Sequence, residues 1–179
     1  GEASALNELG VVQLGIDDHP AATASHQQAL RIYRELGDKL GEASALNELG
    51  LVQRAAGEYR AAAASHEQAL RLYRELGNRL GEASALNRLG QMQRSVGDYP
   101  EAIANHEQAL ALHRDLGNRI GQATALYGLG ILHQAAGRYA EAIASQEQAL
   151  RLYRDLDYRF GEATALIGLG GAQLAAGNP

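Results

Sequence analysis

The sequence predicts an all-α protein, an α-solenoid of stacked helical hairpins, and three observations lead to that class. The first is a forty-residue repeat: GEASALNELG begins at residue 1 and returns at residue 41, and blocks 1–40 and 41–80 share 27 of 40 positions. The second is the spacing of apolar residues, which follow steps of three and four in both halves of each block. The third is a glycine between the halves, since a left-handed glycine commonly ends a helix. Because the halves are helical, this period indicates a solenoid and not a propeller.

The whole chain of 179 residues divides into a single array without gaps. The sequence starts at Gly1 and stops at Pro179 inside the pattern, so we expect a piece of a longer protein. Four whole repeats are followed by a half repeat that forms a terminal helix, and their bounds are 1–40, 41–80, 81–120, 121–160 and 161–179.

Each element of a repeat is predicted by its own residues, and the second repeat contains all of them. Its first helix carries Leu49 and Val52 on one face, and Gly57 stands where a left-handed residue would end that helix. The second helix then repeats the helical spacing with Ala62, His66, Ala69 and Tyr73. Gly77 is placed to end the second helix, and Asn78 is placed to accept from the free N–H groups that open the next one.

The pattern inside each repeat resembles the tetratricopeptide repeat. In the second repeat the matching residues are Leu46, Leu49, Gly50, Gly57, Tyr59, Ala62 and Ala69, with His66 at the phenylalanine position of the family. A leucine replaces the aromatic residue of the family's first helix, a glutamine its later tyrosine, and Leu-Gly-Asn its closing proline. The resemblance covers the chain and implies a right-handed superhelix. Forty-residue repeats of this sort are similar to those of large bacterial regulators, polarity adaptors and kinesin light chains.

Two columns of the repeat have structural interpretations. A glycine recurs inside every first helix, at Gly10, Gly50, Gly90, Gly130 and Gly170. Because glycine costs about 1 kcal/mol there relative to alanine, we expect close helix packing against facing residues such as Ala62 and Ala69. A histidine recurs in the second helices, at His26, His66 and His106. Successive helices lie about 10 Å apart, too far for these side chains to share a zinc ion, so we expect half-buried histidines and no metal site.

Composition excludes several functions. The net charge of −5 argues against a nucleic-acid partner, since such proteins usually carry a basic excess or face. No apolar run is long enough for a membrane span, and no secretory signal is visible. The chain contains no cysteine, which excludes disulfides and suits a cytoplasmic protein. No nucleophile motif, phosphate loop or pair of carboxylates appears, so we expect no enzyme, no catalytic residue and no cofactor.

The resemblance assigns positions around the Leu-x2-Leu-Gly core of the first helices to a concave groove. Asparagine recurs there although each copy costs roughly half a kcal/mol in a helix. An amide both donates and accepts, so the column is suited to grip an extended peptide main chain every three residues. Alternatively, the asparagines bond the neighbouring helix or are copies retained from duplication. The expected partner-binding residues are Asn7, Asn47, Asn87, Leu51, Arg54, Arg88, Arg94, Tyr127, Ile131 and Gln134.

The leading functional prediction is a protein–protein interaction module that binds a peptide or partner domain in this groove. Its polar first repeats and apolar far end predict a partner with acidic residues near Arg54 and Arg94 and a hydrophobic anchor near Tyr127. One alternative is a sensor or autoinhibitory arm of a larger bacterial ATPase-type transcription regulator. Another is a self-assembling scaffold, a homodimer through residues 161–176. Its apolar face would be Ala163, Leu166, Leu169 and Ala172.

Overall fold

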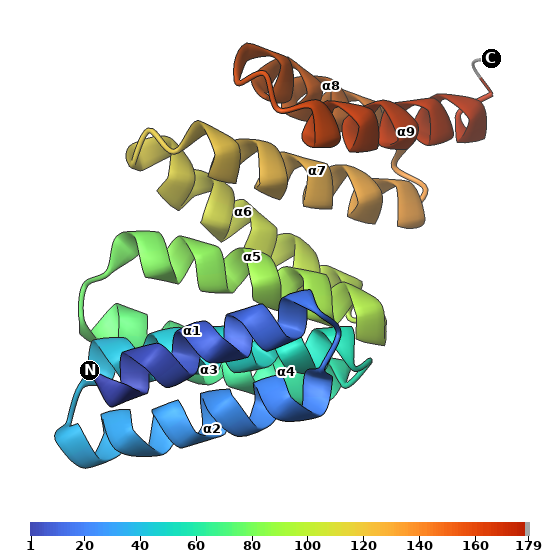
Figure 1. Ribbon diagram of the computed structural model, residues 1–179. Helices are drawn as coiled ribbons and strands as arrows, with labels where there is room; N and C mark the ends of the chain where they lie inside the picture. The colour runs from blue at the N-terminus through green and yellow to red at the C-terminus, as the bar shows by residue number, and fades with distance from the viewer. Residues whose placement is uncertain (178–179) are drawn as a thin grey trace.

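The computed structural model describes residues 1–177, and over these residues it consists of helices joined by short turns (Figure 1). The helices are α1 (Glu2–Gly15), α2 (His19–Leu36), α3 (Lys39–Ala55), α4 (Tyr59–Glu75), α5 (Arg79–Val96), α6 (Tyr99–Asp115), α7 (Arg119–Ala135), α8 (Tyr139–Asp155) and α9 (Arg159–Ala175). The predicted solenoid of helical hairpins is confirmed. Residues 178 and 179 of the predicted half repeat lie outside the described residues. No helix in the described part has an apolar stretch long enough to cross a membrane.

The odd-numbered helices form the inner layer of the stack. Each helix packs against the next one in the chain, and the hairpins follow one another along the solenoid (Figure 1). Beyond these neighbours, α1 contacts α3, α5 contacts α7, and α7 contacts α9. Within residues 1–177 no even-numbered pair makes a comparable contact. Apart from α3 and α5, which make no comparable contact either, successive odd-numbered helices therefore lie closer together than even-numbered ones, as expected for the concave side of a curved stack.

Glycine and asparagine set the turns as the sequence predicts. Gly57 has φ +79° and Gly77 has φ +64°, both in the left-handed region that favours glycine. The Asn78 side-chain oxygen accepts from the Gly81 backbone N–H over 2.9 Å, which caps α5. The last junction differs, because Asp157 takes the left-handed conformation with φ +51° and Tyr158 supplies no side-chain cap to α9. The turn between α8 and α9 therefore forms without the glycine and the asparagine that are used at Gly77 and Asn78.

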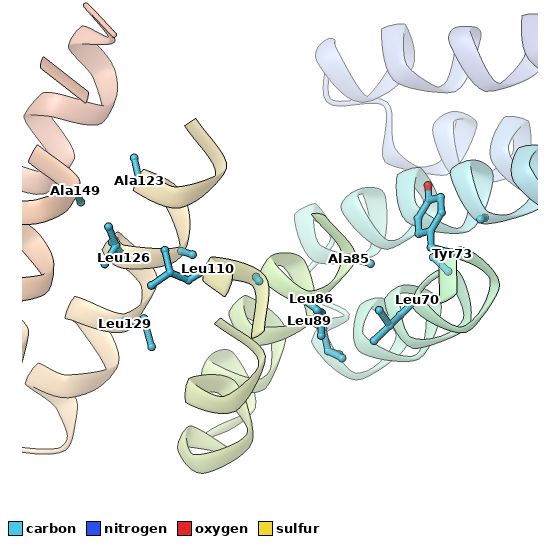
Figure 2. Packing of buried hydrophobic residues seen from close by; sticks show 14 of the residues in the cluster. Leu70, Tyr73, Ala85, Leu86, Leu89, Leu110, Ala123, Leu126, Leu129 and Ala149 are labelled. Atoms are coloured by element: carbon cyan, nitrogen blue, oxygen red, sulfur yellow. The ribbon is translucent and has the colours of Figure 1, made fainter. Parts of the chain in front are cut away.

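Alanines and leucines form one core that runs along the stack. On α5, Ala83, Ala85, Leu86 and Leu89 are buried, and Figure 2 shows Leu86 and Leu89 in the same part of the core as Leu70 of α4. The small alanines let the helices pack closely, and each fully buried leucine contributes about 2 kcal/mol through loss of apolar surface from water. Equivalent residues repeat this packing on α3 and α7, whereas Leu9 of α1 and Leu166 of α9, at the two ends of the stack, are exposed.

The recurring glycine makes room for an imidazole. A Cβ atom on Gly50 would lie 2.5 Å from the His66 ring, and His66 is fully buried, which corrects the half-buried position expected from the sequence. The expected close approach to alanine is seen at Gly90, where a Cβ would lie 3.1 Å from the Ala102 carbonyl oxygen. The same glycine and second-helix side chain meet in four repeats, as Gly10 and His26, Gly50 and His66, Gly90 and His106, and Gly130 and Gln146.

Exposed ion pairs join successive hairpins at the period of the repeat. One set pairs Arg34 with Glu42, Arg74 with Glu82, and Arg154 with Glu162, and the other pairs Lys39 with Glu75, Arg79 with Asp115, and Arg119 with Asp155. Such surface pairs contribute about 0 to 1 kcal/mol each. The first set is interrupted between α6 and α7, where Gln122 replaces the glutamate and its side-chain nitrogen donates to the His113 carbonyl oxygen.

Candidate functional site

The asparagine column bonds to the histidine column. The same hydrogen bond joins Asn7 to His26, Asn47 to His66, and Asn87 to His106. Asn47 and Asn87 are only 8% and 5% exposed, so the protein itself covers most of each side chain. Because an amide oxygen only accepts, the Nδ1 atom of each histidine carries the proton. The asparagine column has two interpretations from the sequence, a peptide-binding ladder or a set of bonds to the neighbouring helix. These hydrogen bonds match the second interpretation.

Asn87 makes a second hydrogen bond that the other repeats lack. Its side-chain nitrogen lies 3.2 Å from Nε2 of His113, which occupies a position held by tyrosine in the other repeats. Since the amide nitrogen donates, the His113 proton must be on Nδ1, and that buried atom has no hydrogen-bond partner in the described part of the chain. Asn87 therefore bridges two buried histidines of α6, His106 and His113.

Burial keeps these histidines neutral. It lowers the pKa of His66 to about 3 and that of His106 to about 4, with a smaller contribution from the positive charges of Arg88 and Arg54 at His66 and of Arg94 at His106. Burial also lowers the pKa of His113. Across residues 1–177, no three His, Asp or Glu side chains gather closely enough to hold a metal ion.

A pocket of about 430 Å³ opens on the inner layer, lined mainly by α5, α7 and α9; we call it the aromatic pocket. Arg54 and Arg94 line it beside Tyr127 and Ile131. Gly128 also lines the pocket, and a Cβ atom there would lie 2.6 Å from the His106 ring. The first two repeats have glutamate at this position and the third has arginine. Glycine at position 128 therefore leaves space in the pocket that a glutamate or arginine side chain would take up.

Aromatic residues of the last junction form one wall of this pocket. The Tyr153 and Tyr158 ring centroids lie 5.6 Å apart, and those of Tyr158 and Phe160 lie 6.3 Å apart. Tyr153 is buried and fixes the base of the wall, whereas Phe160 is 71% exposed. Exposed aromatic surface beside arginine is the composition found at the centre of protein-binding interfaces.

A second pocket, of about 280 Å³, adjoins the first; we call it the arginine pocket. It is lined by Arg54 of α3, Arg88 of α5 and residues at the start of α7, and it shares Arg54, Gln91 and Thr124 with the aromatic pocket. Neither Arg54, Arg88 nor Arg94 belongs to a salt bridge within residues 1–177. The two pockets together therefore carry three cationic side chains with no ion-pair partner.

The structure brings most of the expected partner-binding residues together. The aromatic pocket contains Arg54, Arg94, Tyr127 and Ile131, and the arginine pocket contains Leu51, Arg54, Asn87 and Arg88. Three expected residues line neither pocket, namely Asn7, Asn47 and Gln134. Asn7 is half-buried, and Gln134 lies near α9, where its amide nitrogen would be 3.3 Å from a Cβ on Gly171.

Several residues of the aromatic pocket were not among the expected partner-binding residues. These are His106, Gly128, Tyr153, Tyr158 and Phe160. A usable indication was nevertheless present, because three of them depart from the repeat. Tyr158 follows Asp157 where earlier repeats have Gly-Asn or Gly-Asp, Phe160 replaces leucine or isoleucine, and Gly128 replaces glutamate or arginine.

Sequence comparison decides the family. The family model described as tetratricopeptide repeat matches residues 1–75, 81–155 and 121–179. The chain is a tetratricopeptide-repeat protein. Its nearly complete coverage by this model agrees with the stacked hairpins and inner groove described above. Comparison with curated protein sequences gives no significant match.

Solved structures share the fold of this tetratricopeptide array at low sequence identity. BtubC from P. vanneervenii has a TM-score of 0.86 at 21% identity, with 97% of this chain and 72% of BtubC covered. The apo form of RapI has a TM-score of 0.90 at 14% identity, covering 99% of this chain and 65% of RapI. A Rap protein complexed with competence and sporulation factor has a TM-score of 0.84 at 17% identity, covering 98% of this chain and 49% of the Rap protein.

The last helix of the tetratricopeptide array has an exposed apolar surface that coincides only in part with the expected face. Ala172 is fully buried because α9 packs its face against α7 and α8, which corrects its assignment to an uncovered face. Ala163 and Leu166 are exposed, as expected, and Leu169 is half-buried. The most exposed of the large apolar side chains on α9 are Ile167 and Leu174, at 76% and 74%.

Proposed function

We propose that this array is a protein-interaction module that binds an extended segment of a partner protein in its inner groove. The aromatic pocket is the observation that carries the proposal. It places unpaired arginines beside exposed aromatic and aliphatic surface, on the concave layer of a fold that serves as a protein-interaction scaffold. A concave site with few polar groups and an apolar wall is the usual form of a binding pocket.

The chemistry of the pocket favours an acidic partner with one hydrophobic anchor. Arg54 and Arg94 are placed to pair with carboxylates of the guest, and a guanidinium forms strong two-point hydrogen bonds with a carboxylate. The anchor would bury against Tyr127, Ile131 and Phe160. The Rap protein of similar fold is complexed with competence and sporulation factor, which supports a bound partner for this array as well.

Synthetic peptides test this proposal directly. Peptides that carry two glutamates and one tryptophan or leucine at varied spacing would be titrated by fluorescence anisotropy against the whole chain. We expect Arg94→Glu and Tyr127→Ala each to weaken binding by about tenfold, the scale of a lost interface anchor. Arg151→Glu on the exposed surface of α8 makes the same charge change as Arg94→Glu and should leave affinity unchanged. Equal affinity for all four proteins would contradict the proposal.

A second candidate is a sensor or autoinhibitory arm in a cytoplasmic bacterial regulator. The tetratricopeptide fold shown by the family match is compatible with such an arm, and its ligand would then be a segment of the same longer protein. Sequence adjoining the array in the parent gene tests it, because a nucleotide-switch ATPase domain there would support it and its absence would remove it.

A third candidate is self-assembly through α9. Its support is the exposure of Leu166, Ile167 and Leu174 on the last helix. Light scattering across a concentration series would show a dimer that Ile167→Ser and Leu174→Ser abolish. A wild-type chain that stays monomeric throughout the series would contradict this candidate.

A further inference from the structure

The arginine pocket lies at the place where the repeat changes its charge. The eighth position of the repeat is glutamate in the first two repeats, as Glu8 and Glu48, but arginine in the third, as Arg88. The glutamate that opens α3, α5 and α9 within their first turns is replaced in α7 by Gln122, and α7 has no acidic residue in its first turn. Both changes remove a negative charge next to the same junction, and one of them adds a positive charge.

The side chains of this pocket suit a group with several negative oxygens. Arg54 and Arg88 line it from two helices, while Ser84, Gln91 and Asn118 supply further hydrogen-bond donors. No acidic residue lines the pocket. Glu48 is the carboxylate that acts on Arg88 through its charge, but no salt bridge joins the two in the described part of the chain.

Burial makes this arrangement costly without a bound anion. Burial lowers the pKa of Arg88, and the positive charge of Arg54 lowers it further against the opposing effect of Glu48. His113, which is 2% exposed, also lines the pocket, and its Nδ1 atom has no hydrogen-bond partner within residues 1–177. A partly buried cation that forms no salt bridge and an unpaired buried N–H are both stabilised when a negative group binds beside them.

We propose that the arginine pocket is a phosphoryl subsite, which takes the phosphate group of a phosphorylated side chain in the partner segment. This proposal rests on the proposed function, since the same segment would fill the adjoining aromatic pocket through the shared residues Arg54, Gln91 and Thr124. A phosphoryl dianion neutralises two arginines at once and offers oxygens to donors in several directions. The pocket volume of about 280 Å³ leaves space for that group and for ordered water.

Inorganic phosphate is the first probe, because it needs no peptide and so tests the subsite separately from the proposed function. Titration of the 15N-labelled chain should shift the amide signals of Ser84, Gln91 and Gly121. Arg88→Glu installs the residue of the first two repeats, and Arg88→Gln removes the charge alone; each should weaken phosphate binding by about tenfold or more. Arg151→Glu is the control and should bind as the wild type does. Circular dichroism checks that every variant is helical.

Peptides then distinguish free phosphate from a phosphorylated partner. In the glutamate and tryptophan peptides, one glutamate is replaced by phosphoserine or by alanine. The phosphoserine peptide should bind at least about tenfold more tightly than the alanine peptide, and Arg88→Glu should remove that advantage while Arg94→Gln retains it. Phosphate that binds wild type and Arg88→Glu equally, or a phosphoserine advantage that survives Arg88→Glu, would overturn the subsite. If no peptide binds but phosphate binding still depends on Arg88, the peptide-binding function fails and the anion site remains.

Discussion

The first two repeats and the junction between the third and fourth are made from the same hairpin, yet they use its variable positions differently. In the second repeat, Gly50, His66 and Asn47 form a closed unit in which the ring fills the space above the glycine and bonds to the amide. Next to the later junction, the third repeat keeps the glycine, the histidine and the asparagine of this unit. Around them, however, Arg88, His113 and Gln122 have replaced the residues found in the other repeats. Both pockets are lined in part by residues of the fourth repeat that follow this junction.

This difference separates two kinds of residue in an array of near copies. Residues that recur in register, such as the glycine, histidine and asparagine columns, hold each hairpin together. Residues that interrupt the register, such as Arg88, Gly128 and Phe160, line the pockets, where they are joined by His106 and Asn87 of the recurring columns. In this chain the departures from the repeat, more than the repeat itself, mark the candidate binding site.

The largest expected effect is on the closed unit of the second repeat. Gly50→Ala puts a Cβ atom 2.5 Å from the buried His66 ring, and such overpacking should lower the free energy of unfolding by about 3 kcal/mol. Gly170→Ala is the matched change, with no atom within 4 Å, and should raise stability by up to about 1 kcal/mol through helix propensity. Urea unfolding measures both. A neutral Gly50→Ala would show that the glycine column does not hold the imidazole.

The second-largest effect on stability is expected at Asn87, which bridges His106 and His113. Asn87→Ala removes the partners of His106 and His113 together and should cost about 2 kcal/mol, because buried polar atoms are left unpaired. Asn7→Ala removes a single hydrogen bond from a half-buried residue and should cost clearly less. If urea unfolding gave equal losses for the two variants, the second hydrogen bond of Asn87 would have no energetic role.

The buried histidines should make the array sensitive to acid. The folded-state pKa of His66 is about 3, below its ordinary value of 6.5, so only the unfolded chain takes up a proton as pH falls between these values. Stability is therefore fully present above about pH 6.5 and is lost towards about pH 3, with a slope of up to about 1.4 kcal/mol per pH unit for each such histidine.

His66→Gln isolates this contribution, since Gln146 occupies the same position in the fourth repeat. The unfolding free energy of the variant should fall less steeply between pH 6 and pH 4 than that of the wild type, by roughly one histidine's share. Parallel pH profiles for the two proteins would count against a depressed pKa at His66.

The smallest effect is expected at the interrupted set of ion pairs. Gln122→Glu restores the residue found at positions 42, 82 and 162, where it pairs with an arginine, and it should stabilise the array by about 0.5 kcal/mol. Thermal unfolding at low and high salt is the measurement, since a surface ion pair weakens as salt rises. A destabilised variant would indicate that Gln122 is needed for its hydrogen bond to the His113 carbonyl oxygen.

The repeat period, the helical spacing and the glycine turns were enough to predict the fold, because each depends on local residues. Gly57, Gly77 and Asn78 act within a few residues of themselves, and the structure places them as predicted. The burial of His66 was predicted only in part, because its depth depends on Gly50 in the other helix of the hairpin.

The candidate site could be predicted only where it follows the columns of the inner layer. Tyr127, Ile131 and Arg94 belong to those columns and line the aromatic pocket. Tyr153 lies on an even-numbered helix and Tyr158 in a turn, so neither belongs to a column of the inner layer, and the packing of α8 against α9 brings them to the pocket. The binding of Asn47 to His66 depends likewise on side-chain directions that a one-dimensional pattern does not contain.

Mapping a bound peptide on the assigned amide spectrum of the whole chain shows whether the partner binds at the departures from the repeat. A peptide with two glutamates and a tryptophan, selected by the anisotropy titration, would be added to the 15N-labelled protein. We expect the largest shifts to cluster at the residues that interrupt or flank the repeat, near Gln91, Thr124, Tyr127 and Phe160. Shifts concentrated on α1 and α2, or on the outer faces of α4 and α6, would contradict it.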